Sequence, residues 1–302
     1  MMRKIYIIGR RDERTHYDTP QSMVAGLAEV TKSARYHAAV LEDLLFVFDG
    51  SSLKVLTSEG NDLADADAIF MMGWFKDKML EDTALAVSMY AQAHDIPLLN
   101  SEVSFARSNS KLSQCVAAAI QNVSIVPFVF SMSHARMQQG SQEAGLQYPL
   151  IIKSVRASRG RDNYLVHTKA ELDDVLAHQP EVRFMVQHFV PNDGDYRIII
   201  MGNEVRFVMH RLAQEGTHLS NTSQGGTATQ IAPDNLPETM REQALRISKT
   251  LRREVTGVDM IVDKTTGQHY MLEINNMPQL STGSLVTEKM SALDAFLTNW
   301  AA

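Results

Sequence analysis

Residues 257–263 read Gly-Val-Asp-Met-Ile-Val-Asp, and residues 270–275 read Tyr-Met-Leu-Glu-Ile-Asn. Two such apolar runs separated by a short polar turn predict a β-hairpin. If the turn centres on Thr266, Asp259 lies opposite Glu273, with Cβ atoms about 4.5–5.5 Å apart. Asn275 lies two residues after Glu273 and therefore on the same face of the pleated strand. We expect the hairpin to bring three oxygen-bearing side chains together.

These side chains predict a site for a hard cation. Like charges directly opposite on a sheet destabilise it, and a divalent cation between them compensates. Ligands that are all oxygen suit Mg²⁺ or Mn²⁺. The alternative is an acidic, solvent-facing side of an edge hairpin. The hairpin alone does not decide between the two.

The composition indicates a folded protein with more than one core. The chain has 302 residues, 44% of them hydrophobic and 21% charged. This length predicts two domains, and this composition excludes wholesale disorder. Its 29 basic and 35 acidic residues give a net charge of −6, which argues against a nonspecific nucleic-acid binder.

Cysteine usage and apolar runs predict a cytoplasmic protein. Cys115, the one cysteine, permits no internal disulfide and lies in an apolar stretch that reads as a buried helix. The longest apolar run, residues 115–120, is far short of the roughly 20 residues of a membrane span. Residues 5–8 are expected to form a strand rather than part of a signal peptide.

The first third of the chain predicts a small α/β domain. Residues 5–8 and 68–72 have the pattern of buried strands, and residues 76–94 have helical spacing. Such alternation predicts a parallel sheet covered by helices over residues 1–100. No Gly-x-Gly-x-x-Gly follows Gly9, so we expect no dinucleotide site there.

The remainder, residues 101–302, predicts a mixed α+β arrangement. Strands are expected at residues 126–130, 149–153, 163–166 and 184–189, a hairpin at 196–201 and 204–210, and a helix from Pro237. Ser108 is expected to cap a helix that carries Lys111 near its first turn. A lysine there is unfavourable by itself but useful beside a bound phosphate. Lys153 ends a strand and is a second candidate phosphate ligand, although each lysine alone reads equally well as a surface residue.

Several segments, in order and spacing, resemble the ATP-grasp superfamily, and within it the ribosomal-protein glutamate ligase (RimK) type. They are residues 149–153, 186–190, 194–197, 210–216, 221–226, 257–259 and 272–278. The resemblance covers about residues 105–285. It implies a fold with two α+β lobes, about residues 101–185 and 186–302, and an ATP site between them.

The resemblance also implies roles for individual residues. Lys111 and Lys153 correspond to phosphate ligands, and Arg211 to a basic position beside the transferred phosphate. Asn221 lies in a segment that helps to complete the metal and phosphate site. The remaining implied roles are adenine contact for Gln187, His188 and Phe189, and binding of Mg²⁺ or Mn²⁺ for Asp259, Glu273 and Asn275.

The implied activity is ATP-dependent joining of a carboxylate to an amine through an acyl phosphate, with Arg211 and Lys153 as catalytic cations. The expected partners are ATP, a carboxylic acid and an amine, either an amino acid or a peptide, with no membrane and no nucleic acid. The sequence is compatible with a homo-oligomer. Two alternatives remain: a kinase that phosphorylates a small molecule, and a regulatory module that binds ATP without turnover.

The chain departs from the family at two places. The loop after Lys153 has a single glycine where the family has a glycine-rich lid, and it carries Arg156, Arg159 and Arg161. These arginines are expected to bind phosphate, to attract an acidic substrate, or to form a solvated basic turn. Asp195 and Arg197 are open between a salt bridge and substrate contact. The residues after Asn275 also depart, which leaves the acid pocket unassigned.

Overall fold

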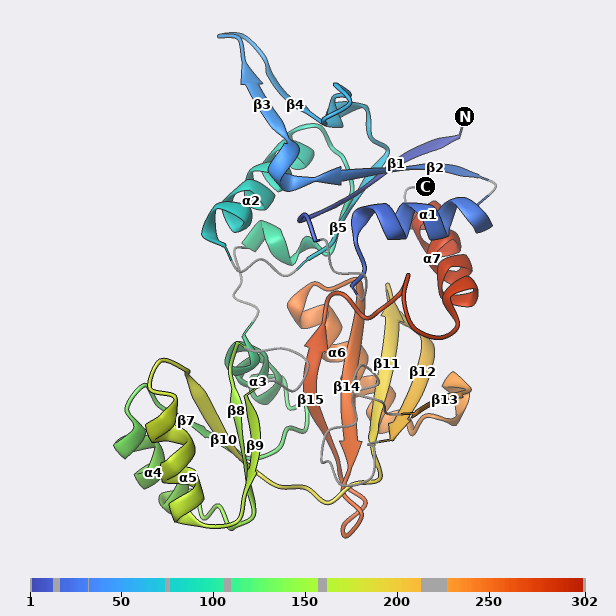
Figure 1. The fold of residues 1–302 in the computed structure, drawn as a ribbon. Coiled ribbons are helices and arrows are strands. Elements are labelled where there is room, and N and C mark those ends of the chain that lie inside the picture. The colour runs from blue at the N-terminus through green and yellow to red at the C-terminus, as the bar shows by residue number, and fades with distance from the viewer. Residues whose placement is uncertain are drawn as a thin grey trace.

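The computed structural model describes residues 2–12, 17–31, 33–73, 77–105, 110–156, 162–212 and 227–300. These residues form a parallel sheet, two antiparallel sheets with helices packed on them, and a separate two-stranded hairpin (Figure 1). The predicted mixed α/β and α+β class is confirmed. No helix within the described ranges has both the length and the apolar character needed to cross a membrane.

The N-terminal sheet is parallel throughout, with the order β2-β1-β5-β6. Its elements are β1 (Arg3–Gly9), α1 (Pro20–Val30), β2 (Ala34–Val40), β5 (Ala68–Met71), α2 (Lys78–Ala93) and β6 (Leu98–Leu99). Ile5 and Ile7 belong to the same cluster as Leu27 of α1, whereas Ile8 belongs to that of Val87 of α2. The central strand is therefore covered on both faces, as in other parallel sheets.

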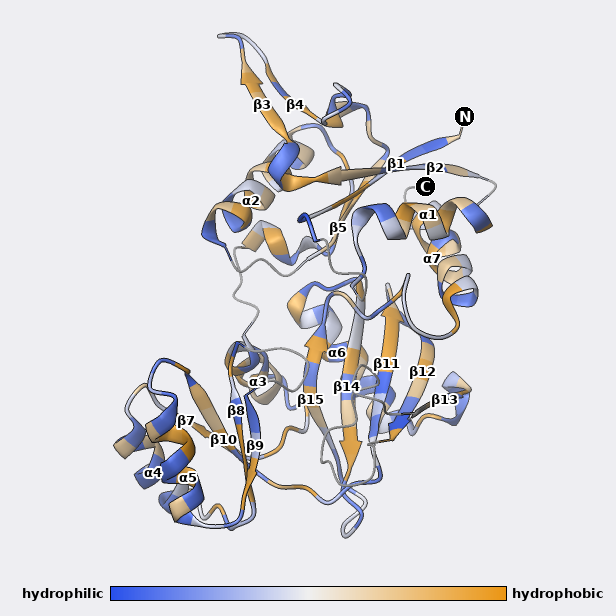
Figure 2. Cartoon of the chain, viewed as in Figure 1, coloured by the Kyte–Doolittle hydropathy of each residue, from blue (hydrophilic) through white to orange (hydrophobic). Residues whose placement is uncertain are grey.

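A hairpin of β3 (Leu45–Phe48) and β4 (Leu53–Leu56) projects from this domain (Figure 1). Figure 2 colours β3 hydrophobic along its length, and all of its residues are exposed. This hairpin was not predicted.

The central sheet is antiparallel, with the order β7-β10-β8-β9. Its elements are β7 (Phe128–Phe130), α4 (His134–Glu143), β8 (Leu150–Ser154), β9 (Asn163–Val166), α5 (Lys169–His178) and β10 (Phe184–His188). Ile152 and Val186 pack with Met137 of α4 and Leu172 of α5 on one face. The predicted lobe boundary, between residues 185 and 186, lies inside β10, which pairs with β7 and β8.

The C-terminal sheet is antiparallel, with the order β13-β12-β11-β14-β15. Its elements are α3 (Lys111–Ile120), β11 (Asp195–Met201), β12 (Glu204–Leu212), β13 (Thr227–Ile231), α6 (Glu238–Leu251), β14 (Val255–Val262), β15 (His269–Asn275) and α7 (Val286–Trp300). Ile198 and Ile200 of β11 pack with α6. Ile199 and Met201 point the other way, into a core shared with α1 and α7, which lie side by side (Figure 1).

Candidate functional site

The predicted pairing of Asp259 with Glu273 is confirmed: the two residues are cross-strand partners on β14 and β15. The reason differs from the expected one. Val262 pairs with His269, which centres the turn between Thr265 and Thr266, and the register shifts by one residue after Asp259. This irregularity in the ladder brings Glu273 opposite Asp259.

Asn275 bridges the two carboxylates, as its position in the pleat predicts. Its Nδ2 lies 3.0 Å from Oε1 of Glu273 and 3.3 Å from Oδ2 of Asp259. The other carboxylate oxygen of Glu273, Oε2, lies 3.4 Å from Nζ of Lys111. Burial raises the pKa of the Glu273 carboxyl, but the charges of Lys111 and Arg197 and the hydrogen bond from Asn275 together outweigh it and hold that pKa below its usual range.

The donor set fits a divalent cation. A single atom of Asn275 already lies between two carboxylate oxygens, where a cation would contact both acids. Exchanging the oxygen and nitrogen of this amide would turn its oxygen towards that point. Within the described residues no group of three His, Cys, Asp or Glu side chains is suited to a metal, so this set of two acids and an amide depends on Asn275.

Two arginines bind Asp259 tightly. Arg197 donates from Nε and Nη2 at 2.9 and 2.8 Å, and Nη2 of Arg211 lies 2.9 Å from Oδ2. Arg211 also donates from Nε and Nη2 to Asp195, both at 2.7 Å. The salt-bridge alternative for Asp195 and Arg197 is therefore realised, but each residue pairs with another partner across the sheet rather than with the other. Arg211 lies within β12 rather than after it.

This network shifts its two acids in opposite directions. Burial raises the pKa of Asp259, but the charges of Arg197 and Arg211 outweigh it and lower the pKa to about 2. Burial and the charge of Asp259 raise the pKa of Asp195 to about 6, against the attraction of Arg211. Asp259 is therefore held ionised, as a cation ligand must be.

Lys111 and Lys153 lie on separate elements, α3 and β8, and Lys111 contacts Glu273 of this cluster. Lys111 is the first residue of α3, which Ser110 caps; the predicted cap, Ser108, lies outside the described residues. Lys153, on β8, is only 6% exposed. Burial lowers the pKa of Lys153. Lys111 lowers it further, and Cys115 and Glu273 raise it by smaller amounts than burial lowers it. Within the described part of the chain, its ammonium has no hydrogen bond or salt bridge.

The segment predicted to contact adenine begins on β10. Gln187 is buried and donates to the carbonyl of Val126 at 3.4 Å, while His188 and Phe189 are half-buried at the end of the strand. Met185 pairs with Lys153, so Gln187, two residues later, shares a sheet face with that lysine. Asn221, Arg159 and Arg161 lie outside the described residues, and Arg156 is exposed.

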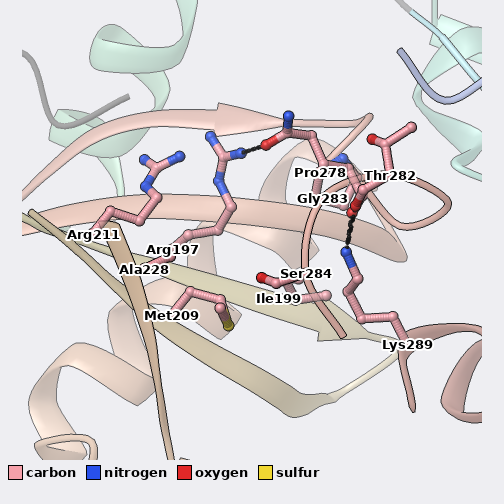
Figure 3. Close-up of a pocket in the computed structure, with 11 residues that line it drawn as sticks. Arg197, Ile199, Met209, Arg211, Ala228, Pro278, Thr282, Gly283, Ser284 and Lys289 are labelled. Atoms are coloured by element: carbon pink, nitrogen blue, oxygen red, sulfur yellow. Dashed lines mark hydrogen bonds between the residues drawn. The ribbon is translucent and has the colours of Figure 1, made fainter. Parts of the chain in front are cut away.

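A pocket of about 270 Å³ adjoins Arg197 and Arg211 (Figure 3). It is bounded by β11, β12, β13 and the segment from Pro278 to Lys289. Neither Gln279 nor Lys289 was predicted to line a site. The departure after Asn275 was the available signal, but it carries no recognisable spacing.

Comparison with known proteins identifies the fold. The model of the RimK-like ATP-grasp domain matches residues 106–295. The chain is 27% identical over 216 residues, 70% of its length, to a probable alpha-L-glutamate ligase of Pasteurella multocida. It is 29% identical over 153 residues, 49% of its length, to human beta-citrylglutamate synthase B. These matches span 66% and 37% of the relatives' own lengths.

Solved structures of ATP-grasp ligases are similar to this chain in fold. The ATP-grasp ligase PsnB, complexed with a phosphomimetic variant of its minimal precursor, Mg and ADP, gives a TM-score of 0.71 at 13% identity, covering 98% of both chains. D-alanyl-alanine synthetase A from Vibrio cholerae gives 0.66 at 15% identity, covering 100% of this chain and 98% of that one. At such identities the likeness concerns the fold alone.

Proposed function

This chain belongs to the RimK-like ATP-grasp family, and from that premise we propose that it is an ATP-dependent carboxylate–amine ligase. Relatives named glutamate ligase and citrylglutamate synthase support a ligase that forms carbon–nitrogen bonds. The salt bridge between Lys111 and Glu273 carries the proposal, because it places a phosphate-binding candidate directly beside the carboxylate hairpin. The substrates are a carboxylic acid and an amine, the amine being an amino acid or a peptide, and a cytoplasmic location stays a prediction.

In the proposed site, Lys111 and Lys153 bind the phosphates of ATP, and Gln187, His188 and Phe189 contact the adenine. Asp259, Glu273 and Asn275 would hold Mg²⁺ or Mn²⁺, which when bound supplies positive charge beside the phosphates. Asn221 helps to complete this site. The buried ammonium of Lys153 supports the assignment, since a phosphate oxygen would compensate a charge that the described residues leave without a partner.

The reaction begins when the acid's carboxylate attacks the γ-phosphate and ADP leaves. An amine then attacks the acyl phosphate, which forms the amide and releases phosphate. The first step brings two anions together, so fixed cations must stabilise the charge that develops. Arg211 meets this need because its guanidinium is held by Asp195 and Asp259 and needs no reorganisation. Lys153 is the second catalytic cation.

Release of ADP by the wild-type protein tests the activity. L-glutamate, L-aspartate and citrate serve as acids, each with and without a panel of amino acids as amines and with and without Mg²⁺. A ligase is expected to release ADP fully only when acid, amine and Mg²⁺ are all present. Release that needs no amine would indicate a kinase, and binding of ATP without release would indicate a regulatory module.

Glu273→Gln tests the metal assignment. Removing one of the two carboxylate charges should lower Mg²⁺-dependent turnover about 100-fold, in the range of losing one stabilising group at a reacting centre. Thermal unfolding should change little, since Glu273 is partly exposed and, among the described residues, its salt bridge is with Lys111. Glu242→Gln, the same change at an exposed position of α6, is the control. Normal turnover of Glu273→Gln would remove Glu273 from the metal site.

A further inference from the structure

The segment Pro278 to Ser284 leaves β15 and forms one wall of the pocket beside Arg197 and Arg211. Its backbone is irregular: Gln279 has a φ of 63°, Gly283 of 76° and Leu285, just after it, of 56°. Left-handed conformations at residues other than glycine are costly and persist only where the surroundings enforce them. The contacts that hold this loop are therefore informative.

Asp18, from the N-terminal domain, binds the donors of this loop. It precedes Thr19, the N-cap of α1, and is 3% exposed. Its carboxylate accepts from the backbone N–H of Leu280 at 2.7 Å and of Ser281 at 2.9 Å. It also accepts from the hydroxyl groups of Ser281 at 2.9 Å and Thr282 at 3.3 Å. One buried carboxylate from another domain thus satisfies four donors of the loop.

Lys289, from α7, binds the acceptors of the same loop. Its ammonium donates to the carbonyl groups of Gln279 and, at 2.8 Å, Thr282 (Figure 3). Lys289 is 5% exposed, and burial lowers its pKa to about 8 against the attraction of Asp18. The loop is therefore held from two sides. The Asp18 carboxylate accepts hydrogen bonds from its N–H groups, and the Lys289 ammonium donates hydrogen bonds to its carbonyl groups.

The held loop presents Gln279 to the site. Nη1 of Arg197 donates to Oε1 of Gln279 at 3.1 Å, while the rest of that guanidinium binds Asp259. The described residues that line the pocket include Arg197, Arg211 and Lys289 and no carboxylate. Most of this charge is already paired, because Arg197 binds Asp259, Arg211 binds Asp195 and Asp259, and Lys289 donates to loop carbonyl groups. Nη1 of Arg211 forms no hydrogen bond with the described residues, which leaves one donor for a carboxylate ligand in this pocket.

In the proposed ligase the acid lies in this pocket, because its carboxylate must reach the phosphate beside Arg211. We propose that Asp18 and Lys289 are positioning residues, which fix the Pro278 to Ser284 loop and so set the affinity for the acid. This inference rests on the proposed ligase function. It assigns control of acid binding to the N-terminal domain, whose Asp18 contacts the loop and none of Lys111, Lys153 or Glu273. Loss of Asp18 should therefore weaken acid binding and leave nucleotide binding unchanged.

The experiment compares wild type with Asp18→Asn, in which an NH₂ group faces loop donors. KM is measured for ATP and for whichever of L-glutamate, L-aspartate and citrate best supports ADP release. We expect the KM for the acid to rise about tenfold, as loss of a charged hydrogen-bond acceptor predicts, with the KM for ATP unchanged. Ser281→Ala, which removes one donor and is the milder change, should give a smaller rise. Asp18→Glu should restore part of the loss.

Asp62→Asn is the matched control. Asp62 also accepts a hydrogen bond from a backbone N–H of the N-terminal domain, that of Ala64, but it does not contact the loop. Hydrogen exchange of the peptide containing Leu280 and Ser281 provides a readout independent of turnover, and exchange should accelerate in Asp18→Asn. Unchanged KM for the acid, equal changes for acid and ATP, or unchanged exchange would each overturn the proposal. If wild type releases no ADP with any acid, the ligase function fails, while exchange still decides whether Asp18 holds the loop.

Discussion

Two buried lysines, in different regions of the molecule, have opposite surroundings. Lys153 on β8 and Lys289 on α7 are 6% and 5% exposed, and burial lowers the pKa of both. Lys289 donates to two backbone carbonyl groups. Lys153 has no such partner among the residues that the structure describes. The two buried lysines therefore differ in role. Lys289 stabilises the Pro278 to Ser284 loop through its hydrogen bonds, whereas Lys153 carries a charge that a bound anion would compensate.

The strongest test of this contrast is Lys153→Met. We expect ATP affinity, measured by calorimetry, to fall by about 10- to 100-fold, because a charged hydrogen bond contributes roughly 1.5–3 kcal/mol. The free energy of unfolding without nucleotide should rise, because methionine has a similar shape and no charge to desolvate. Lys169→Met, at an exposed lysine of α5 in the same lobe, is the control. Unchanged ATP affinity would place Lys153 outside the nucleotide site.

Lys111→Met should have a smaller effect of the same kind. Lys111 is already paired with Glu273, and its side chain is 18% exposed, so a phosphate would compensate less charge. We expect ATP affinity to fall about threefold to tenfold in the same assay. Lys249→Met, near the end of α6, should leave the affinity unchanged. A loss as large as that of Lys153→Met would erase the distinction between a paired and an unpaired lysine.

Lys289→Met sharpens the comparison through pH. The pKa of Lys289 is about 8 in the fold, below the usual lysine value of 10.5. Between these values the unfolded chain binds the proton and the native one does not, so this group makes wild type more stable as pH rises. From pH 7.5 to 9.5, wild type should gain about 1–2 kcal/mol over Lys289→Met in urea unfolding. A difference that does not change with pH would show that Lys289 has an ordinary pKa.

The β14–β15 hairpin shows how far sequence reasoning reached. Alternation and a polar turn were enough to predict which side chains share a face, and Asp259, Glu273 and Asn275 do so. The actual turn centre and the irregularity after Asp259 were not predictable. Met271 and Ile274, three residues apart on β15, both pack in the core with α6, and a pattern of apolar residues does not specify that packing.

The partners of the arginines were beyond prediction for a different reason. Arg197 and Asp259 are 62 residues apart in the sequence and meet because β11 pairs with β14. The order of strands in a sheet depends on the packing of the whole domain. Local propensity therefore left open whether Arg197 pairs with Asp195 or with another acid.

The sequence by itself determined the family, through the order and spacing of its motifs. It also determined the parallel N-terminal sheet, the hairpins, and the convergence of the acids and amide of the β14–β15 hairpin, because periodic patterns act over a few residues. Only the tertiary structure decided which charges are satisfied. Asp18 and Leu280 are 262 residues apart, yet one accepts a hydrogen bond from the other because α1 packs on α7. Such contacts form when buried surfaces assemble, and no local pattern encodes the partner of a buried charge.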